Sequence, residues 1–259
     1  MRELAYNTRH SMEDIVSTMA KLTPKSTNMT PVRVGCSNDG GYILLKELLD
    51  GSISYSFGVG RMTQFEQDMA SRNYTNYMYD PYIYSPNVSG SKYVFKKLGV
   101  SDRDTQSMRT IETIIKENDH TDEQNMILQC DIEGSEFDIF TDTPDEVLNQ
   151  FSQIVIEYHW LDHCIMDTGD FKGVNVNYQK MKNTFYKLSN NFTPFHVHGN
   201  NWVDYFLLNG SIVPEVIEVS YVRNDLVEFN NSKLSFPTAI DAPNNRNKKD
   251  IPLGSFSWS

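Results

Sequence analysis

The stretch Ile53-Ser-Tyr-Ser-Phe-Gly-Val-Gly60 decides the fold that we predict for this chain of 259 residues. Its first five residues are mostly β-branched, aromatic or small and predict a strand. Gly58 and Gly60 follow, and glycine lets a backbone pass close to a bound nucleotide because it has no Cβ. A helix is predicted over 63–72 and a second strand over 76–79. This order is typical of an α/β nucleotide-binding unit.

An acidic residue ends the second predicted strand. Asp80 lies twenty residues after Gly60, the usual interval for an acid that accepts ribose hydroxyls. The third glycine of the dinucleotide motif is absent, because Thr63 and Gln64 stand where it would fall. A nicotinamide cofactor is therefore disfavoured, since its pyrophosphate must sit on the helix N-terminus. S-adenosylmethionine, which has no pyrophosphate, is the better candidate.

Strand-like and helix-like segments alternate along the rest of the chain, which predicts an α/β fold with a mostly parallel sheet and helices on both faces. Later strands are predicted at 126–130, 153–157, 195–197, 205–208 and 216–221, and helices at 11–21, 106–116, 133–140 and 176–188. A hairpin is expected from the apolar runs 32–34 and 42–45. A loop that opens with Asn209-Gly210, the strongest short turn signal, joins the last two strands.

The composition restricts the classes of function. The chain has 23 Lys and Arg against 34 Asp and Glu, a net charge of −11, which disfavours a nucleic-acid partner. No apolar run approaches the roughly 20 residues of a membrane span, and no secretory signal is visible. The three cysteines are too few for a disulfide framework. We therefore expect a cytoplasmic protein with reduced thiols.

Two further predicted strands end in polar residues. Asp131 and Glu133 follow the strand 126–130, and their carboxylates could position a substrate, hold a metal or transfer a proton. Glu157 and His159 close the next strand. Because imidazole titrates near neutral pH, His159 could remove a proton from a substrate hydroxyl. The alternatives are that Glu133 or Ser135 only caps the following helix and that His159 is a buried structural histidine.

A last polar group follows the predicted strand 195–197. His196 and His198 share one face and could bind zinc, although no third ligand is evident nearby. The amides of Asn200 and Asn201 and the indole of Trp202 suit a hydroxyl-rich ligand. An ordinary turn at the end of the strand is the alternative, because Gly-Asn-Asn is turn-forming.

Taken in order, these motifs resemble the FkbM-type methyltransferases. The resemblance covers about 33–245 and rests on Arg33-Val-Gly35, Asp39-Gly-Gly-Tyr42, Ser56-Phe-Gly-Val-Gly60, Phe65-Glu66, Tyr79-Asp-Pro81, Asp131-Ile-Glu-Gly-Ser-Glu136, Ile156-Glu157, His159, His198-Gly-Asn-Asn201 and Pro214-Glu-Val-Ile-Glu218. That family is similar to class I S-adenosylmethionine-dependent methyltransferases, with a Rossmann-like, seven-stranded, mostly parallel sheet and an antiparallel last strand. The Asn209-Gly210 turn would serve that antiparallel pair. We expect an N-terminal helical extension over 1–30 and one methyltransferase domain over 31–259 with a loop-rich tail.

The resemblance also implies an activity, O-methylation of a hydroxyl on a sugar, glycan or glycosylated metabolite. The cofactor-binding residues it implies are Ser56, Gly58, Gly60, Glu66, Asp80 and Asp131. Glu66 enters this set as a substitute, because Ser56 replaces the acid common in the glycine motif. We expect His159 to be the catalytic base, with His198 as its rival, and Asp131 and Glu157 to orient the substrate or hold a cation.

Metal dependence stays open at this point. Metal-dependent relatives carry an adjacent acidic pair where this chain has Glu157-Tyr158. If a divalent cation such as magnesium binds, Asp131 and Glu157 are its expected ligands. A second class of function is a non-catalytic module with the same fold that holds a nucleotide or glycan, which the changed glycine motif favours. A nicotinamide oxidoreductase is the weakest alternative.

Overall fold

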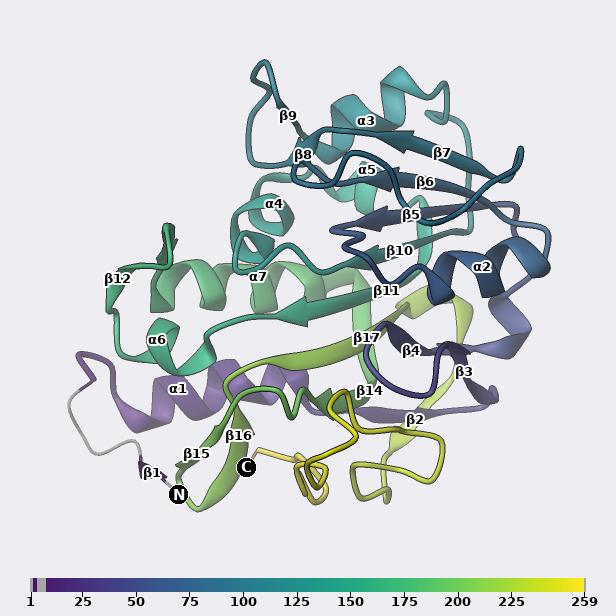
Figure 1. Cartoon of the computed structure of the whole chain (residues 1–259). Helices are drawn as coiled ribbons and strands as arrows, with labels where there is room; N and C mark the ends of the chain where they lie inside the picture. Colours follow the sequence, from purple (N-terminus) through teal and green to yellow (C-terminus); the bar gives the residue numbers. More distant parts are fainter. Residues whose placement is uncertain (1, 4–7, 259) are drawn as a thin grey trace.

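The computed structural model describes residues 2–3 and 8–258, and a seven-stranded sheet forms its centre (Figure 1). The strands, in spatial order, are β14 (Phe192–Gly199), β17 (Ile217–Arg223), β11 (Phe151–Tyr158), β10 (Met126–Cys130), β5 (Ile53–Phe57), β6 (Thr75–Tyr79) and β7 (Tyr93–Lys96). β17 runs antiparallel to both of its neighbours, and the other neighbouring strands are parallel. The predicted mostly parallel sheet with an antiparallel last strand is thus confirmed.

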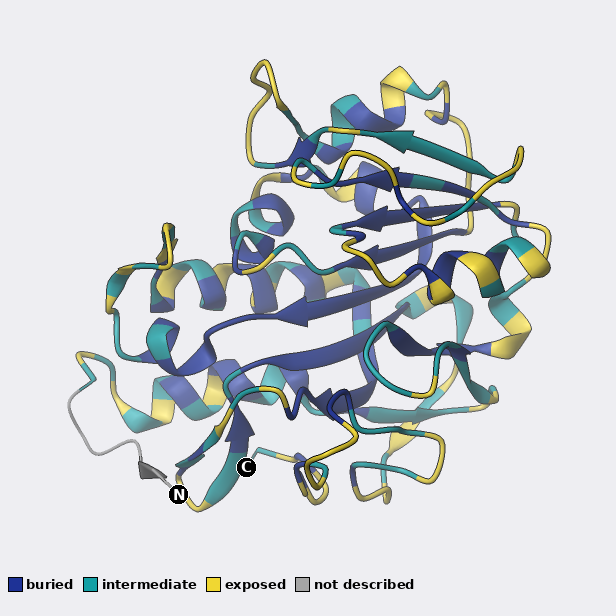
Figure 2. Cartoon of the chain, viewed as in Figure 1, coloured by how far each residue is buried: buried dark blue, intermediate teal, exposed yellow. Residues whose placement is uncertain are grey.

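Helices cover both faces of this sheet, as predicted. One face carries α2 (Gln64–Ser71) and the hairpin of β3 (Pro31–Gly35) and β4 (Gly41–Leu45). The other face carries α1 (Met12–Met19), α3 (Ile111–Glu117), α4 (Glu136–Asp142), α5 (Asp145–Leu148), α6 (Leu161–Ile165) and α7 (Tyr178–Asn191). Successive strand residues point to opposite faces. Ile127 and Val155 therefore join the core under α2, whereas Leu128 and Ile154 join the core on the other face. Figure 2 shows the central strands buried between these layers.

The remaining strands form small sheets at the periphery. They are β1 (Arg2–Glu3) with β15 (Tyr205–Leu208) and β16 (Ser211–Pro214), β2 (Lys25–Thr27) with β18 (Phe229–Asn231), β8 (Gly99–Val100) with β9 (Met108–Arg109), and β12 (Gly169–Phe171) with β13 (Val174–Val176). Three short 3-10 helices complete the described elements: η1 (Ala20–Leu22), η2 (Lys46–Leu48) and η3 (Asn224–Leu226).

The expected role of the Asn209-Gly210 turn was wrong. This turn joins β15 to β16, outside the seven-stranded sheet. Both residues have positive φ, 49° and 78°, so the turn is tight and pairs Leu208 directly with Ser211. The chain therefore completes a separate hairpin before β17 enters the main sheet.

Local chemistry sets two helix boundaries. Ser11 caps α1 as expected, because its side chain accepts a hydrogen bond from the Asp14 amide at 3.2 Å. The helix predicted over 133–140 begins only at Glu136, since Glu133 and Gly134 have φ of 59° and 109°, outside the helical region. Within the described chain, no helix has the length and apolar character needed to cross a membrane. The division at residue 30 stays a prediction.

Candidate functional site

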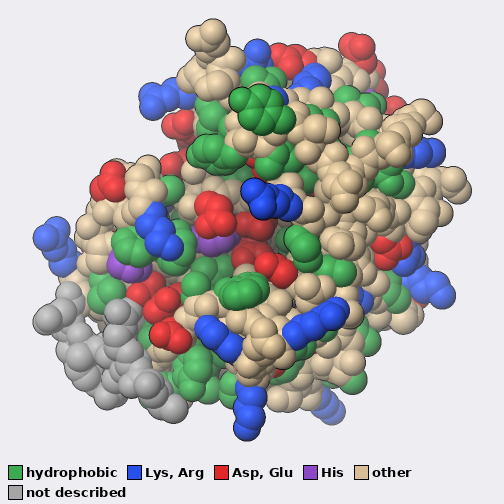
Figure 3. Space-filling model, viewed as in Figure 1, with side chains coloured by type: hydrophobic (Ala, Val, Ile, Leu, Met, Phe, Trp, Pro, Cys, Tyr) green, Lys and Arg blue, Asp and Glu red, His purple; other side chains and the backbone are tan. Residues whose placement is uncertain are grey.

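A cavity of about 590 Å³ opens at the carboxyl ends of β5, β6 and β10. Its walls include the loops that follow these strands, at 58–62, 80–83 and 131–133. Open α/β sheets bind ligands at this edge. Figure 3 shows acidic side chains and a histidine gathered in a hollow at the centre of one face of the molecule.

The two glycines after β5 have different reasons to be glycine. Gly58 has φ +75°, and a Cβ there would lie 1.6 Å from the carbonyl oxygen of Asp131. Gly60 has φ +58° and lines the cavity, and its Cβ would meet no atom within 4 Å. Gly58 is therefore required by packing against the end of β10, whereas Gly60 leaves open space at the cavity wall.

Asp80 joins two of the loops that line the cavity. Its Oδ2 accepts hydrogen bonds from the amides of Val59 and Gly60 at 3.2 and 3.0 Å. Its Oδ1 accepts from the amides of Tyr82 and Ile83 at 2.8 and 3.2 Å. Asp80 lies where a ribose-binding acid was expected, and in this structure its carboxylate holds the glycine loop in place. Contact with a ribose stays a prediction.

Of the two expected cofactor-binding residues Ser56 and Glu66, only Glu66 lines the cavity. Ser56 is buried in β5 and does not line the cavity. Glu66 extends from α2 into the cavity wall, and among the described residues its Oε2 has no hydrogen-bond partner. Burial raises the pKa of Glu66 to about 7, and the Ser56 hydroxyl opposes this shift. A buried carboxyl oxygen without a hydrogen-bond partner is suited to a cationic or hydroxyl group of a ligand.

The other end of the cavity is apolar. Pro81, Ile83, Val100 and Met108 contribute to its lining. Met108 and Pro81 lie close together, since a Cβ on Gly99 would be 2.5 Å from Met108 Sδ and 3.3 Å from Pro81 Cγ. Such a surface suits a flat heterocyclic ring.

Four side chains, which we call the His159 cluster, lie at or beside the acidic end: Asp131, Glu133, Glu157 and His159. The Nε2 atom of His159 is 3.6 Å from Asp131 Oδ1, 3.7 Å from Glu133 Oε2 and 3.8 Å from Glu157 Oε1. Asp131 and Glu133 line the cavity, whereas His159 and Glu157 are buried beside it. The structure thus brings together the residues expected at the ends of β10 and β11.

Glu136 supports this cluster, and the sequence reasoning gave it no role at the site. Its side chain is fully buried, and its Oε1 lies 2.9 Å from Nδ1 of His159. The same oxygen accepts hydrogen bonds from the amides of Ile132 and Gly134, each at 3.1 Å. Glu136 therefore fixes both the turn after β10 and the histidine ring. The only sequence signal for this role is an acidic residue four positions after Ile132. An acid at the start of the following helix would be explained equally well by helix capping.

Burial and mutual repulsion shift the pKa values in the cluster. Burial works against the charged form of His159, but Glu136 and the other carboxylates raise its pKa to about 10. Burial raises the pKa of Asp131 to about 7; His159 opposes this shift, and Glu136 and Glu133 add to it. Burial, followed by repulsion from Asp131, raises the pKa of Glu157 well above its usual range. The site thus concentrates negative charge and favours a bound cation or proton.

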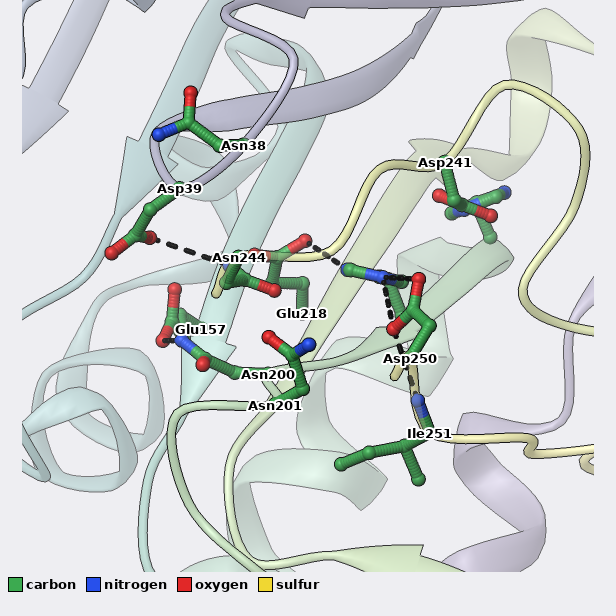
Figure 4. Close-up of polar contacts among 12 residues, drawn as sticks. Asn38, Asp39, Glu157, Asn200, Asn201, Glu218, Asp241, Asn244, Asp250 and Ile251 are labelled. Atoms are coloured by element: carbon green, nitrogen blue, oxygen red, sulfur yellow. Dashed lines mark hydrogen bonds and ion pairs between the residues drawn. The ribbon is translucent and has the colours of Figure 1, made fainter. Parts of the chain in front are cut away.

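The predicted rival base, His198, belongs to a different group, the His198 network (Figure 4). Its Nδ1 is 3.1 Å from Glu218 Oε2, and its Nε2 is 3.1 Å from both oxygens of Asp250. Asn244 donates to Glu218 Oε1 at 2.7 Å and to Asp39 Oδ1 at 3.3 Å. His198 is buried and does not line the cavity. The structure therefore does not bring His198 to the acidic end of the cavity.

The other residues of the predicted polar segment have separate partners. Nε2 of His196 lies 2.8 Å from Asp241 Oδ1, whereas His198 contacts Glu218 and Asp250. The two histidines therefore do not meet at one metal site. Asn200 donates to Glu157 Oε1 at 2.7 Å, and Asn201 donates to the carbonyl of Asn245 at 3.0 Å. Within the described residues, metal-ligand spacing occurs at Asp131, Glu133 and His159, a set that does not include Glu157.

Comparison with known proteins does not assign the chain to a family. A scan against protein-family models found no match, and a search of curated proteins found none either.

Proposed function

We propose that the protein is an S-adenosylmethionine-dependent O-methyltransferase that acts on a hydroxyl of a sugar, glycan or glycosylated metabolite. The observation that carries this proposal is one cavity with three chemically different parts along the carboxyl edge of the sheet. An apolar end lies at Pro81 and Met108, a glycine loop and Asp80 form the middle, and an acidic end lies at Asp131. The sheet has the architecture that the resemblance implies.

The cofactor matches these parts in order. Its adenine would lie against the apolar end, and its ribose beside the loop held by Asp80. Its methionine portion would pass Gly60, where no Cβ obstructs it, toward Glu66 and Asp131. The cofactor carries a positive sulfonium and a positive ammonium group. An acidic end that includes the buried, unpartnered Oε2 of Glu66 favours both charges.

The chemistry requires little beyond alignment and removal of one proton. The acceptor oxygen attacks the methyl carbon in line with the sulfur. The new O–C bond forms as the C–S bond breaks, and S-adenosylhomocysteine leaves. The hydroxyl proton passes to a carboxylate of the His159 cluster, of which Asp131 lines the end of the cavity nearest the expected methyl group.

The acceptor class is supported by a second surface beside the cavity. Asp39 lines the cavity, and burial raises its pKa, while side-chain hydrogen bonds from Asn244 and Trp202 oppose the shift. Trp202 leaves 54% of its surface exposed, which is unusual for a residue of this size. A carboxylate beside an exposed indole suits a sugar, which offers hydroxyls at its edge and C–H groups on its face.

Transfer of a labelled methyl group tests the activity. The protein is incubated with methyl-labelled S-adenosylmethionine and a panel of mono- and oligosaccharides, and label in the carbohydrate is measured. We expect label in at least one sugar and release of S-adenosylhomocysteine. A protein that binds a glycan or nucleotide but transfers no methyl group to any acceptor would instead be a non-catalytic binding module. That result would overturn the proposal.

A further inference from the structure

We infer that the His159 cluster binds one first-row divalent cation, such as Mn²⁺, through Nε2 of His159 and the carboxylates of Asp131 and Glu133. The cation site rests on its own geometry. Only its role in methyl transfer rests on the proposed function.

The spacing of the cluster is the first argument. The oxygens of Asp131 and Glu133 lie 3.6 and 3.7 Å from Nε2 of His159, beyond the 2.7–3.2 Å typical of hydrogen bonds. Candidate ligand atoms of Asp131, Glu133 and His159 all lie within 4.8 Å of one another. Ligand atoms about 2.1 Å from one octahedral ion would lie about 3.0 Å apart where they are adjacent and about 4.2 Å apart where they are opposite. The atoms therefore surround a gap of ionic size instead of bonding directly to each other.

The orientation of His159 is the second argument. Its Nδ1 faces two acceptors, Glu136 Oε1 at 2.9 Å and the carbonyl oxygen of Glu157 at 3.1 Å. Two acceptors require a proton on Nδ1, so a neutral ring has its lone pair on Nε2, toward the cluster. Histidine ligands of metals commonly donate their other N–H to a carboxylate in this way. Glu136 is thus a positioning residue for the ligand His159.

Unsatisfied polar atoms are the third argument. His159 is 4% exposed. Oδ1 of Asp131 is buried and makes no hydrogen bond among the described residues, and the distance from it to Nε2 of His159 is 3.6 Å, too long for one. Buried polar atoms without partners are costly and uncommon. A single cation would satisfy these atoms and offset the repulsion between the carboxylates.

The donor set indicates the class of cation. Carboxylates suit Mg²⁺, Ca²⁺ and Mn²⁺, while imidazole suits first-row transition metals and zinc. One imidazole with two carboxylates therefore favours Mn²⁺ over Mg²⁺. In the proposed reaction, the cation would lower the pKa of a bound acceptor hydroxyl and make its proton easier to remove.

Titration of the metal-free protein with Mn²⁺, followed by calorimetry and by electron paramagnetic resonance of unbound Mn²⁺, tests this inference. We expect one Mn²⁺ per chain in the wild type. Binding should be at least about tenfold weaker in His159→Gln and in Glu133→Gln, because each loses a ligand. The Glu133 side chain is 77% exposed, so that variant should fold normally. The matched control Asp250→Asn changes an acid of the His198 network and should bind Mn²⁺ as the wild type does.

Two results would overturn the inference: no Mn²⁺ binding by the wild type, or equal binding by wild type and Glu133→Gln. Binding of S-adenosylhomocysteine, measured on the same samples, separates this inference from the proposed function. If Mn²⁺ binds and the nucleoside does not, the cation site stands and the methyltransferase proposal fails. If the nucleoside binds and Mn²⁺ does not, the cation inference alone fails.

Discussion

Two buried histidines sit among carboxylates at the same edge of the sheet, and they differ in how completely they are satisfied. Both His159 and His198 have a pKa raised to about 10 by nearby carboxylates, against the effect of burial. They are linked by register, since Glu157 pairs with Glu218 and Glu218 pairs with His198. Both ring nitrogens of His198 have partners at 3.1 Å. Nε2 of His159 has none within hydrogen-bond distance, beside an open cavity.

This difference teaches that charge alone does not identify a functional histidine. A fully hydrogen-bonded buried network stabilises a structure and leaves no atom for a ligand. A ring held by one nitrogen, with the other facing a gap, is prepared for a ligand. Under the proposed function, the His159 cluster therefore carries the chemistry and the His198 network contributes stability. The experiments that follow test this division.

The largest expected effect is on methyl transfer. Asp131→Asn should lower the rate about 10³-fold, because it removes a carboxylate at the reacting end. Asp250→Asn makes the same chemical change in the His198 network and should keep the rate within about threefold of wild type. The labelled-methyl assay measures both. Equal losses in the two variants would contradict the division between the two regions.

Removal of the imidazole from the His198 network should cost stability. His198→Ala leaves Glu218 and Asp250 without their buried cation, so the free energy of unfolding should fall by about 3 kcal/mol. Urea unfolding measures this change, and calorimetry should show unchanged affinity for S-adenosylhomocysteine in the folded variant. A stability within about 0.5 kcal/mol of wild type would mean that the network contributes little.

The same network should make stability depend on pH. The folded-state pKa of His198 is about 10, above its unfolded value near 6.5. Its contribution is therefore complete below about pH 6.5 and is lost as the pH rises toward 10. We expect wild type to lose about 3 kcal/mol more than His198→Ala between pH 7 and pH 9.5. Urea unfolding at several pH values measures this difference, and parallel curves would remove His198 as its source.

The smallest expected effect lies on the acceptor side. Trp202→Ala should raise KM for the sugar about fivefold, because it removes a contact surface worth about 1 kcal/mol. The variant should bind S-adenosylhomocysteine normally, and its stability should change by less than about 0.5 kcal/mol, since Trp202 is half-exposed. Tyr186→Ala, on the distant helix α7, is a control. An unchanged KM would exclude Trp202 from the acceptor site.

Much of the fold could be predicted because its signals are local. The strands β5 and β10 have the predicted bounds, since each is a continuous buried run closed by a glycine or an acid. Asp80, Asp131 and Glu157 could be placed near one edge of the sheet, because the carboxyl ends of parallel strands meet at the same edge. The turn at Asn209-Gly210 was predicted, but the strand β16 that follows it was not, because the turn signal does not show which of the next residues pair with β15.

The features that could not be predicted depend on contacts between distant segments. Asp250 lies 52 residues after His198, and their pairing is set by how the C-terminal segment crosses the sheet edge. Glu136 was read as part of a helix, since only the folded turn brings it to His159. Ser56 matched a motif position, yet the direction of its side chain within β5 keeps it out of the cavity.

Calorimetric titration with S-adenosylhomocysteine tests the central claim most directly. Wild type should bind one molecule per chain. Gly60→Val should bind at least about tenfold more weakly, because its side chain would enter the space at the cavity wall. Gly210→Val, at an exposed turn that also has positive φ, provides the matched control for backbone strain and should bind as wild type does. No binding by the wild type, or equal binding by Gly60→Val, would contradict the assignment of this cavity to the cofactor.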